Sequence, residues 1–232
     1  MPPIKIIHFS DILCVWAYIG QSNLDQIATK YPDQVSVQVH FCSVFPDTWT
    51  KISTQWKTRG GFDGYARHVQ EVAGKFRNIT VHKDAWAKIR PRSSASPHLF
   101  IKAIELIEGD NTAQGEPTGY SESLAVRAAH ELRSAFFERA QDVSNWAVQR
   151  EVAQQIGVDF ELLAAKIETG EAIAKLATDY DLAHSLRIEG SPTYVLNEGR
   201  QKLFGNVSYG VIEANVNELL TGPSGETASL CA

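Results

Sequence analysis

The sequence feature that most constrains the fold is a short apolar run that ends in a polar turn and a cysteine. The run, residues 4–9, is rich in isoleucine, which is typical of a strand buried on both faces of a sheet. The polar turn follows it, and Cys14 then stands where a helix begins, because apolar residues recur at helical spacing from Trp16 to Tyr31. The chain therefore opens with a strand, a turn that carries a lone cysteine, and a helix.

A cysteine at the start of a helix is a candidate nucleophile. Unpaired N–H groups and the helix macrodipole favour its thiolate by about 0.3–2 kcal/mol, which lowers the pKa by roughly 0.2–1.5 units from about 8.5. The alternative is a small buried hydrophobic side chain, which is the commonest role of a free cysteine. The position of Cys14 alone leaves both interpretations open.

The rest of the chain predicts two more groups of strands and helices. Residues 35–41 alternate apolar and polar with β-branched valines, so they form a strand parallel to the first across a right-handed βαβ unit. We expect a loop over 45–60, then only helices until about residue 186, and finally a strand, a hairpin turn at 197–200, a return strand and a helix. The helices are predicted at 62–76, 96–107 with Ser96 as N-cap, 121–140, 145–156, 160–168, 171–186 and 208–220.

Composition and charge exclude several functions. The net charge of −5, without a dense Lys/Arg run, argues against nucleic acid as a partner. The N-terminus lacks a signal-peptide pattern and no apolar run approaches a membrane span, so we expect a cytoplasmic protein without a membrane partner. The cysteines Cys14, Cys42 and Cys231 form neither a CxxC motif nor a metal spacing, so no metal site or tightly bound cofactor is expected.

A second diagnostic stretch lies far from the first in sequence. Residues 190–193 read Gly-Ser-Pro-Thr and lead into an apolar strand. A proline cannot donate to a sheet ladder, so it is tolerated at the first residue of a strand or at a sheet edge.

The two stretches together resemble the DsbA family of thioredoxin-fold proteins. Residues 10–20, Ser-Asp-x-x-Cys-x-Trp-x-Tyr-Ile-Gly, resemble the start of its FrnE-like branch, where the tetrad is usually Cys-Pro-Trp-Cys. Related kappa-class glutathione transferases and 2-hydroxychromene-2-carboxylate isomerases carry serine at the nucleophile position. Here the tetrad is Cys14-Val15-Trp16-Ala17, so the resolving cysteine is absent. The active-site motif implied by the resemblance comprises Ser10, Asp11, Cys14, Val15, Trp16 and Ala17, with Cys14 as the catalytic residue.

The resemblance implies an α/β thioredoxin fold, β-α-β…β-β-α, interrupted by an all-helical insertion domain. The expected domains are 1–50 with 175–221, the insertion 51–174 and a disordered tail 222–232. Pro192 would be cis beside Cys14, and the backbone of Ser191 would pair with an extended thiol peptide such as glutathione. The family element after the last strand, Phe-Gly-Ser-Asp-Arg, helps to hold the γ-glutamyl end; here Gly205 and Asn206 would serve, although Val207 replaces the acid.

Three functions fit these residues. The leading hypothesis is a monothiol thiol-disulfide oxidoreductase in which glutathione, as co-substrate, supplies the second thiol. A second is a glutathione-dependent transferase or isomerase of the kappa or 2-hydroxychromene-2-carboxylate isomerase type. A third is a non-catalytic thioredoxin-fold binding module with an ordinary thiol. Cys42 is expected to be inert packing, with a distant resolving thiol as the alternative, and Cys231 is expected to be inconsequential. The histidines 82, 98 and 130 are expected to be solvated or in the core, and a homodimer is suggested by the resemblance alone.

Overall fold

A four-stranded mixed sheet forms the base of the molecule. The computed structural model describes residues 3–111 and 119–222. Its strands are β1 (Ile4–Ser10), β2 (Val35–Phe41), β3 (Thr193–Leu196) and β4 (Gln201–Phe204), in the spatial order β2-β1-β3-β4. β1 and β2 are parallel, while β3 is antiparallel to both β1 and β4, so the predicted βαβ unit and hairpin are confirmed.

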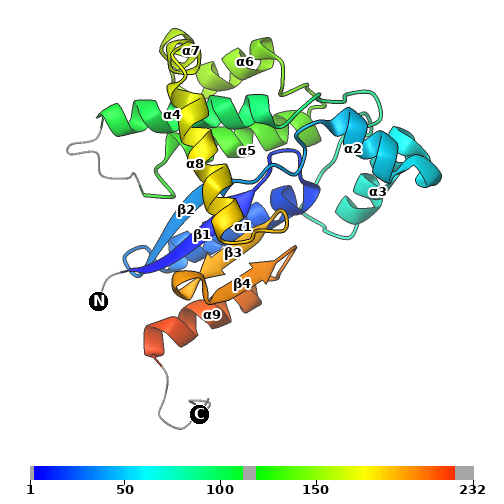
Figure 1. The fold of residues 1–232 in the computed structure, drawn as a ribbon. Coiled ribbons are helices and arrows are strands. Elements are labelled where there is room, and N and C mark those ends of the chain that lie inside the picture. The colour runs from blue at the N-terminus through cyan, green and yellow to red at the C-terminus, as the bar shows by residue number, and fades with distance from the viewer. Residues whose placement is uncertain (1–2, 112–118, 223–232) are drawn as a thin grey trace.

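Alternation along β1 and β3 places different helices on the two faces of the sheet. Ile6 and Tyr194 pack in one hydrophobic cluster with α1 (Val15–Lys30) and α9 (Tyr209–Thr221). Phe9 and Val195 face the other side, where Ala183 of α8 (Glu171–Ser185) covers them. Figure 1 shows α8 running from the helical layer down onto the sheet. The carboxyl end of β1 therefore leads into a turn that is enclosed by helices.

The helices between β2 and β3 gather on one side of the sheet (Figure 1). They are α2 (Thr48–Gln55), the 3₁₀ turn η1 (Lys57–Arg59), α3 (Gly61–Ala73), α4 (Ala95–Asn111), α5 (Leu124–Phe137), α6 (Trp146–Ile156) and α7 (Phe160–Glu168), followed by α8. The hydrophobic core of these helices is continuous with the residues around Cys14, because one cluster contains Ile12, Phe100 and Leu176. The α/β fold with a helical insertion is thus confirmed.

The structure corrects two predicted elements. The expected loop over 45–60 contains helix α2, because the Asp47 carboxylate caps it by accepting from the N–H groups of Trp49 and Thr50. Helix α4 begins at Ala95, not after Ser96, whose hydroxyl instead donates to the carbonyl of Ser144. In both places a proline stands beside a small polar residue, and such a pair occurs in turns as well as at helix starts.

The predicted domain boundaries stay predictions. Helix α8 spans the expected boundary at 174/175, and the main core cluster contains residues from both sides of 50/51. The hairpin turn is a 3₁₀ turn, η3 (Asn197–Gly199), close to its predicted place. The predicted disordered tail lies outside the described residues apart from Gly222, as does Cys231.

Candidate active site

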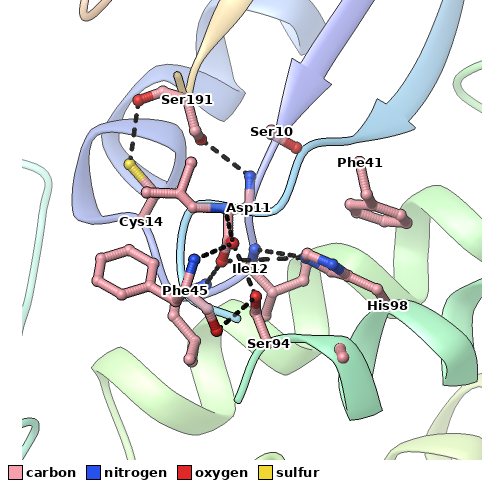
Figure 2. A network of polar contacts seen from close by, with 12 residues as sticks. Ser10, Asp11, Ile12, Cys14, Phe41, Phe45, Ser94, His98 and Ser191 are labelled. Carbon is pink, nitrogen blue, oxygen red and sulfur yellow. Dashed lines mark hydrogen bonds and ion pairs between the residues drawn. The ribbon is translucent and has the colours of Figure 1, made fainter. Parts of the chain in front are cut away.

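Residues 11–14, between β1 and α1, form a turn that we call the active turn. It brings Cys14 against Ser191, the residue before Pro192, as Figure 2 shows. Cys14 is the N-cap residue of α1, and its thiol donates to the carbonyl of Ser191 across 3.2 Å. The hydroxyl of Ser191 accepts from the backbone N–H of Asp11 at 2.9 Å. The Ser191–Pro192 peptide bond is cis, the form that the family resemblance implied. Two hydrogen bonds to Ser191 therefore hold together two segments that lie far apart in the sequence.

The thiol of Cys14 is less acidic than its position at a helix start suggests. The residue is only 6% exposed, and burial raises the pKa of its thiol above the ordinary value. The hydrogen bond to Ser191 and the N–H groups of Ala17 and Trp16 lower that pKa, but burial is the larger effect. The predicted lowering of the pKa is therefore wrong, because a helix terminus acts weakly on a thiol that has lost its water.

Asp11 organises the turn that precedes Cys14. Its side chain is fully buried, and one carboxylate oxygen accepts from the N–H of Leu13 at 2.9 Å. The other oxygen accepts from the N–H groups of Val44 and Phe45, both at 3.0 Å, and from the hydroxyl of Ser94 at 2.7 Å (Figure 2). One carboxylate thus joins the active turn to the segment after β2 and to the start of α4.

His98 is a site residue that the sequence did not single out. It lies on α4, is fully buried, and its Nε2 accepts from the N–H of Ile12 at 3.2 Å (Figure 2). Its ring stacks on Phe41 with centroids 4.3 Å apart. Burial lowers its pKa to about 4, so the imidazole is neutral at pH 7 and remains an acceptor. No spacing in the sequence links residue 98 to residue 12, so only the packing of α4 identifies this role.

The other residues of the predicted motif flank the active turn, and all of them except Trp16 are buried. Val15 and Ala17 are buried in the main core cluster, and Ala17 stands where the Cys-Pro-Trp-Cys tetrad has its second cysteine. Ser10 is buried and its hydroxyl accepts from a guanidinium N–H of Arg133 at 2.9 Å. Trp16 is partly exposed and contacts Phe76 edge to face.

Gly205 and Asn206 continue the site beyond Pro192. The N–H of Gly205 donates to the carbonyl of Pro192 at 2.9 Å, and its φ of 85° lies in the region that favours glycine. Asn206 lines a pocket of about 440 Å³ whose wall also contains Ile19 of α1. Its charged lining residues are the exposed cations Lys75 and Arg77, and it contains no acid. The full lining is Ile19, Ser22, Asn23, Lys75, Phe76, Arg77, Asn78, Ile79, Asn206, Val207, Ser208 and Tyr209.

Cys42 fits its predicted role as packing. It is 5% exposed at the end of β2, and burial raises the pKa of its thiol well above the ordinary value. Over residues 3–111 and 119–222, histidines, cysteines and carboxylates form no cluster suited to a metal ion. Within the same ranges, every helix is too short or too polar to cross a membrane.

Comparison with known proteins identifies the fold. A family model described as a DSBA-like thioredoxin domain matches residues 119–217. No curated protein matches significantly. Among solved structures, the cytosolic disulfide reductase DsbM from Pseudomonas aeruginosa with GSH is 18% identical, with a TM-score of 0.65 over 94% of this chain and 100% of that chain.

Two further structures are similar at lower identity. The 2-hydroxychromene-2-carboxylate isomerase has a TM-score of 0.61 at 13% identity and covers 93% of this chain and 96% of its own. The thiol-disulfide exchange protein alpha-DsbA2 from Wolbachia pipientis has a TM-score of 0.57 at 11% identity, over 93% and 81% of the two chains. At these identities the structures establish the fold. The expected resemblance is therefore confirmed at the level of the fold, and the chain has a DsbA-like thioredoxin fold.

Proposed function

We propose that this protein is a monothiol thiol-disulfide oxidoreductase that works with glutathione through Cys14. The observation that carries the proposal is the placement of the Cys14 sulfur 3.2 Å from the carbonyl of Ser191, beside Pro192, with alanine at position 17. A thiol peptide paired with the Ser191 backbone would bring its sulfur to Cys14. Glutathione then has to supply the thiol that the tetrad lacks.

The proposed reaction is two successive thiol-disulfide exchanges. The Cys14 thiolate attacks the glutathione sulfur of a substrate–glutathione disulfide; that S–S bond breaks and the substrate leaves as a thiolate. A second glutathione thiolate attacks the same glutathione sulfur, now bonded to Cys14. This step releases the Cys14 thiolate and glutathione disulfide, so one free glutathione is oxidised for each mixed disulfide reduced, and the other half of the glutathione disulfide comes from the substrate.

The charge of the pocket beside Asn206 supports glutathione as the co-substrate. Lys75 and Arg77 are exposed, and neither forms an ion pair within the described part of the chain. They lie in a chain of net charge −5, at a pocket that is also lined by Ile19 of α1, the helix that begins after Cys14. Glutathione carries two carboxylates, and guanidinium and ammonium groups bind carboxylates well.

The test is reduction of a glutathione mixed disulfide on a peptide, coupled to consumption of glutathione. Cys14→Ser is expected to abolish the activity, whereas the matched control Cys42→Ser retains it, because Cys42 is buried packing. Equal rates for wild type and Cys14→Ser would sink the oxidoreductase proposal and favour a non-catalytic binding module.

A second candidate is a glutathione transferase or isomerase, which the raised pKa of Cys14 favours. A thiol that keeps its proton is a hydrogen-bond donor, like the serine that kappa-class relatives carry at this position. It would then stabilise a bound glutathione thiolate instead of attacking a disulfide. Calorimetry separates the two candidates: tight glutathione binding by Cys14→Ser, with conjugating activity preserved, would identify the transferase.

The proposed cycle requires a compartment that supplies reduced glutathione, and we infer the cytoplasm on that ground. The similar DsbM structure is described as a cytosolic reductase, which is consistent with this inference. The homodimer suggested by the resemblance is testable by light scattering, with a mass near 26 kDa expected for the monomer and about twice that for a dimer.

A further inference from the structure

Residues 47–92, which form α2, η1, α3 and the segment that follows them, carry a positive charge that the rest of the chain does not share. They contain ten of the 22 Lys and Arg residues and four of the 27 Asp and Glu residues, a local net charge of +6. The rest of the chain has a net charge of −11, since the whole carries −5. Figure 1 shows α2 and α3 together at one end of the helical layer. One end of an acidic molecule is therefore basic.

Most of these cations are not neutralised by an acid of the same chain. Among the residues that the structure describes, eight of the ten form no ion pair, and only Lys88 and Arg90 contact a carboxylate. Lys75 and Arg77 belong to the eight and line the pocket that we assign to glutathione. The positive charge of the other six has no role in that pocket, so it is open to an acidic partner.

Two arginines stack on a pair of aromatic rings at this basic end. The guanidinium carbon of Arg92 lies 5.2 Å from the ring centroid of Trp49, and that of Arg90 lies 4.6 Å from the ring centroid of Phe62. The two rings meet edge to face with their centroids 5.3 Å apart. These four side chains form one continuous group, which we call the Trp49 patch. Trp49 is 44% exposed and Arg92 is exposed, whereas the guanidinium of Arg90 already donates to the carboxylate of Asp63.

Arg92 is the member of the Trp49 patch that is best placed to bind a carboxylate. Its guanidinium forms no hydrogen bond or ion pair with the described residues, and the carboxylate of Asp47 nearby is occupied by the N-cap bonds of α2. Stacking over a ring leaves the N–H groups at its edge free, where they match the two oxygens of a carboxylate. Its backbone is fixed, because its carbonyl accepts from the N–H of Thr48 at 3.1 Å.

The Trp49 patch lies next to the segment that holds the active turn. Two residues after Arg92, the hydroxyl of Ser94 donates to the carboxylate of Asp11 at 2.7 Å. The Cα atoms of Arg92 and Ser94 are therefore at most about 7 Å apart. A substrate segment bound at Arg92 is thus close to a disulfide at Cys14.

We propose that the Trp49 patch docks an acidic segment of the protein substrate whose mixed disulfide Cys14 attacks; this inference rests on the proposed function and names its substrate class. A carboxylate of that segment pairs with Arg92, and an apolar side chain beside it packs on the exposed part of Trp49. Charge complementarity favours a protein over a nucleic acid. The acidic remainder of the chain repels a uniform polyanion, whereas a protein presents its carboxylates at one place.

The test is fluorescence anisotropy at low salt with a labelled, thiol-free peptide rich in glutamate and leucine, compared with the same peptide carrying glutamine for glutamate. We expect the glutamine peptide to bind at least about fivefold more weakly. Arg92→Gln should weaken binding of the acidic peptide about twofold to fivefold, and Trp49→Leu, which removes the stack, by a similar factor. The matched control Arg127→Gln removes an exposed arginine from α5 and should leave binding unchanged.

Equal binding by Arg92→Gln and Arg127→Gln would overturn the proposal, as would equal binding of the two peptides. A single-stranded oligonucleotide of the same charge that binds more tightly than the acidic peptide, and loses affinity in Arg92→Gln, would make the partner a nucleic acid instead.

The reduction assay tests the substrate assignment, with a glutathione mixed disulfide on each of the two peptides. We expect kcat/KM to be at least about fivefold higher for the acidic peptide, and this preference to shrink in Arg92→Gln. Binding without such a preference would overturn the assignment. Anisotropy needs no turnover and should give the same affinity in Cys14→Ser, so failure of the proposed oxidoreductase activity would remain a separate result.

Discussion

Replacing Asp11 by asparagine should destabilise the fold while making Cys14 more acidic. The carboxylate accepts one hydrogen bond on one oxygen, from Leu13, and three on the other. The amide can keep its oxygen where three donors converge, which turns its NH₂ group toward the N–H of Leu13. One buried donor left unsatisfied costs about 1–3 kcal/mol, and losing the charge of the acceptor weakens the others, so we expect about 2–4 kcal/mol in total.

The thiol should respond in the opposite direction. The negative charge of Asp11 raises the pKa of Cys14, so Asp11→Asn lowers that pKa and speeds alkylation at neutral pH. Stability is measured by urea unfolding followed by tryptophan fluorescence, and thiol reactivity by the alkylation profile of Cys14. Asp33→Asn, an exposed carboxylate, is the matched control. An unfolding free energy within about 0.5 kcal/mol of wild type, or slower alkylation, would refute this account of the turn.

Three further predictions follow from the same contacts. Lys75→Gln with Arg77→Gln should raise KM for a glutathione mixed disulfide about threefold to tenfold with little change in kcat, since exposed ion pairs contribute about 0.2–1 kcal/mol each; the same KM in steady-state kinetics as in exposed Lys57→Gln would exclude this pocket. Lys102→Met should cost about 3–5 kcal/mol of unfolding free energy, because Asp179 would stay buried without its cation, whereas half-buried Lys175→Met should cost under about 1 kcal/mol. The folded pKa of His98, about 4, lies below its ordinary value of 6.5, so the unfolded chain binds the proton first and stability should fall as pH drops from 6.5 to 4, by about 3 kcal/mol for this residue. Urea unfolding across that range should show a shallower fall in His98→Asn, and an equal fall would contradict the assignment.

Local patterns in the sequence determined the framework and the two motifs. Alternation over 35–41 and helical spacing over 16–31 predicted the parallel βαβ unit, because each pattern reports which face of one element is buried. The pairing of Cys14 with Ser191-Pro192 came from resemblance to a family, and the structure places them in contact. Helix α2 was not predicted, because a Pro-Asp pair occurs in turns as readily as at helix starts. Whether the segment forms a helix depends on the burial of Ile52, which only the folded chain provides.

The chemistry of the site was decided by tertiary structure alone. The sequence placed Cys14 at a helix start and so predicted a lowered pKa, but acidity depends on desolvation by residues that arrive from other elements. His98 and Arg133 come from α4 and α5, each more than eighty residues from the turn in sequence, and no local pattern connects them to it. Whether a buried charge is paired is likewise a property of packing, because it depends on which side chains surround that charge in the folded chain. The sequence determined by itself where the candidate thiol lies; the tertiary structure decided how acidic that thiol is and which residues hold it.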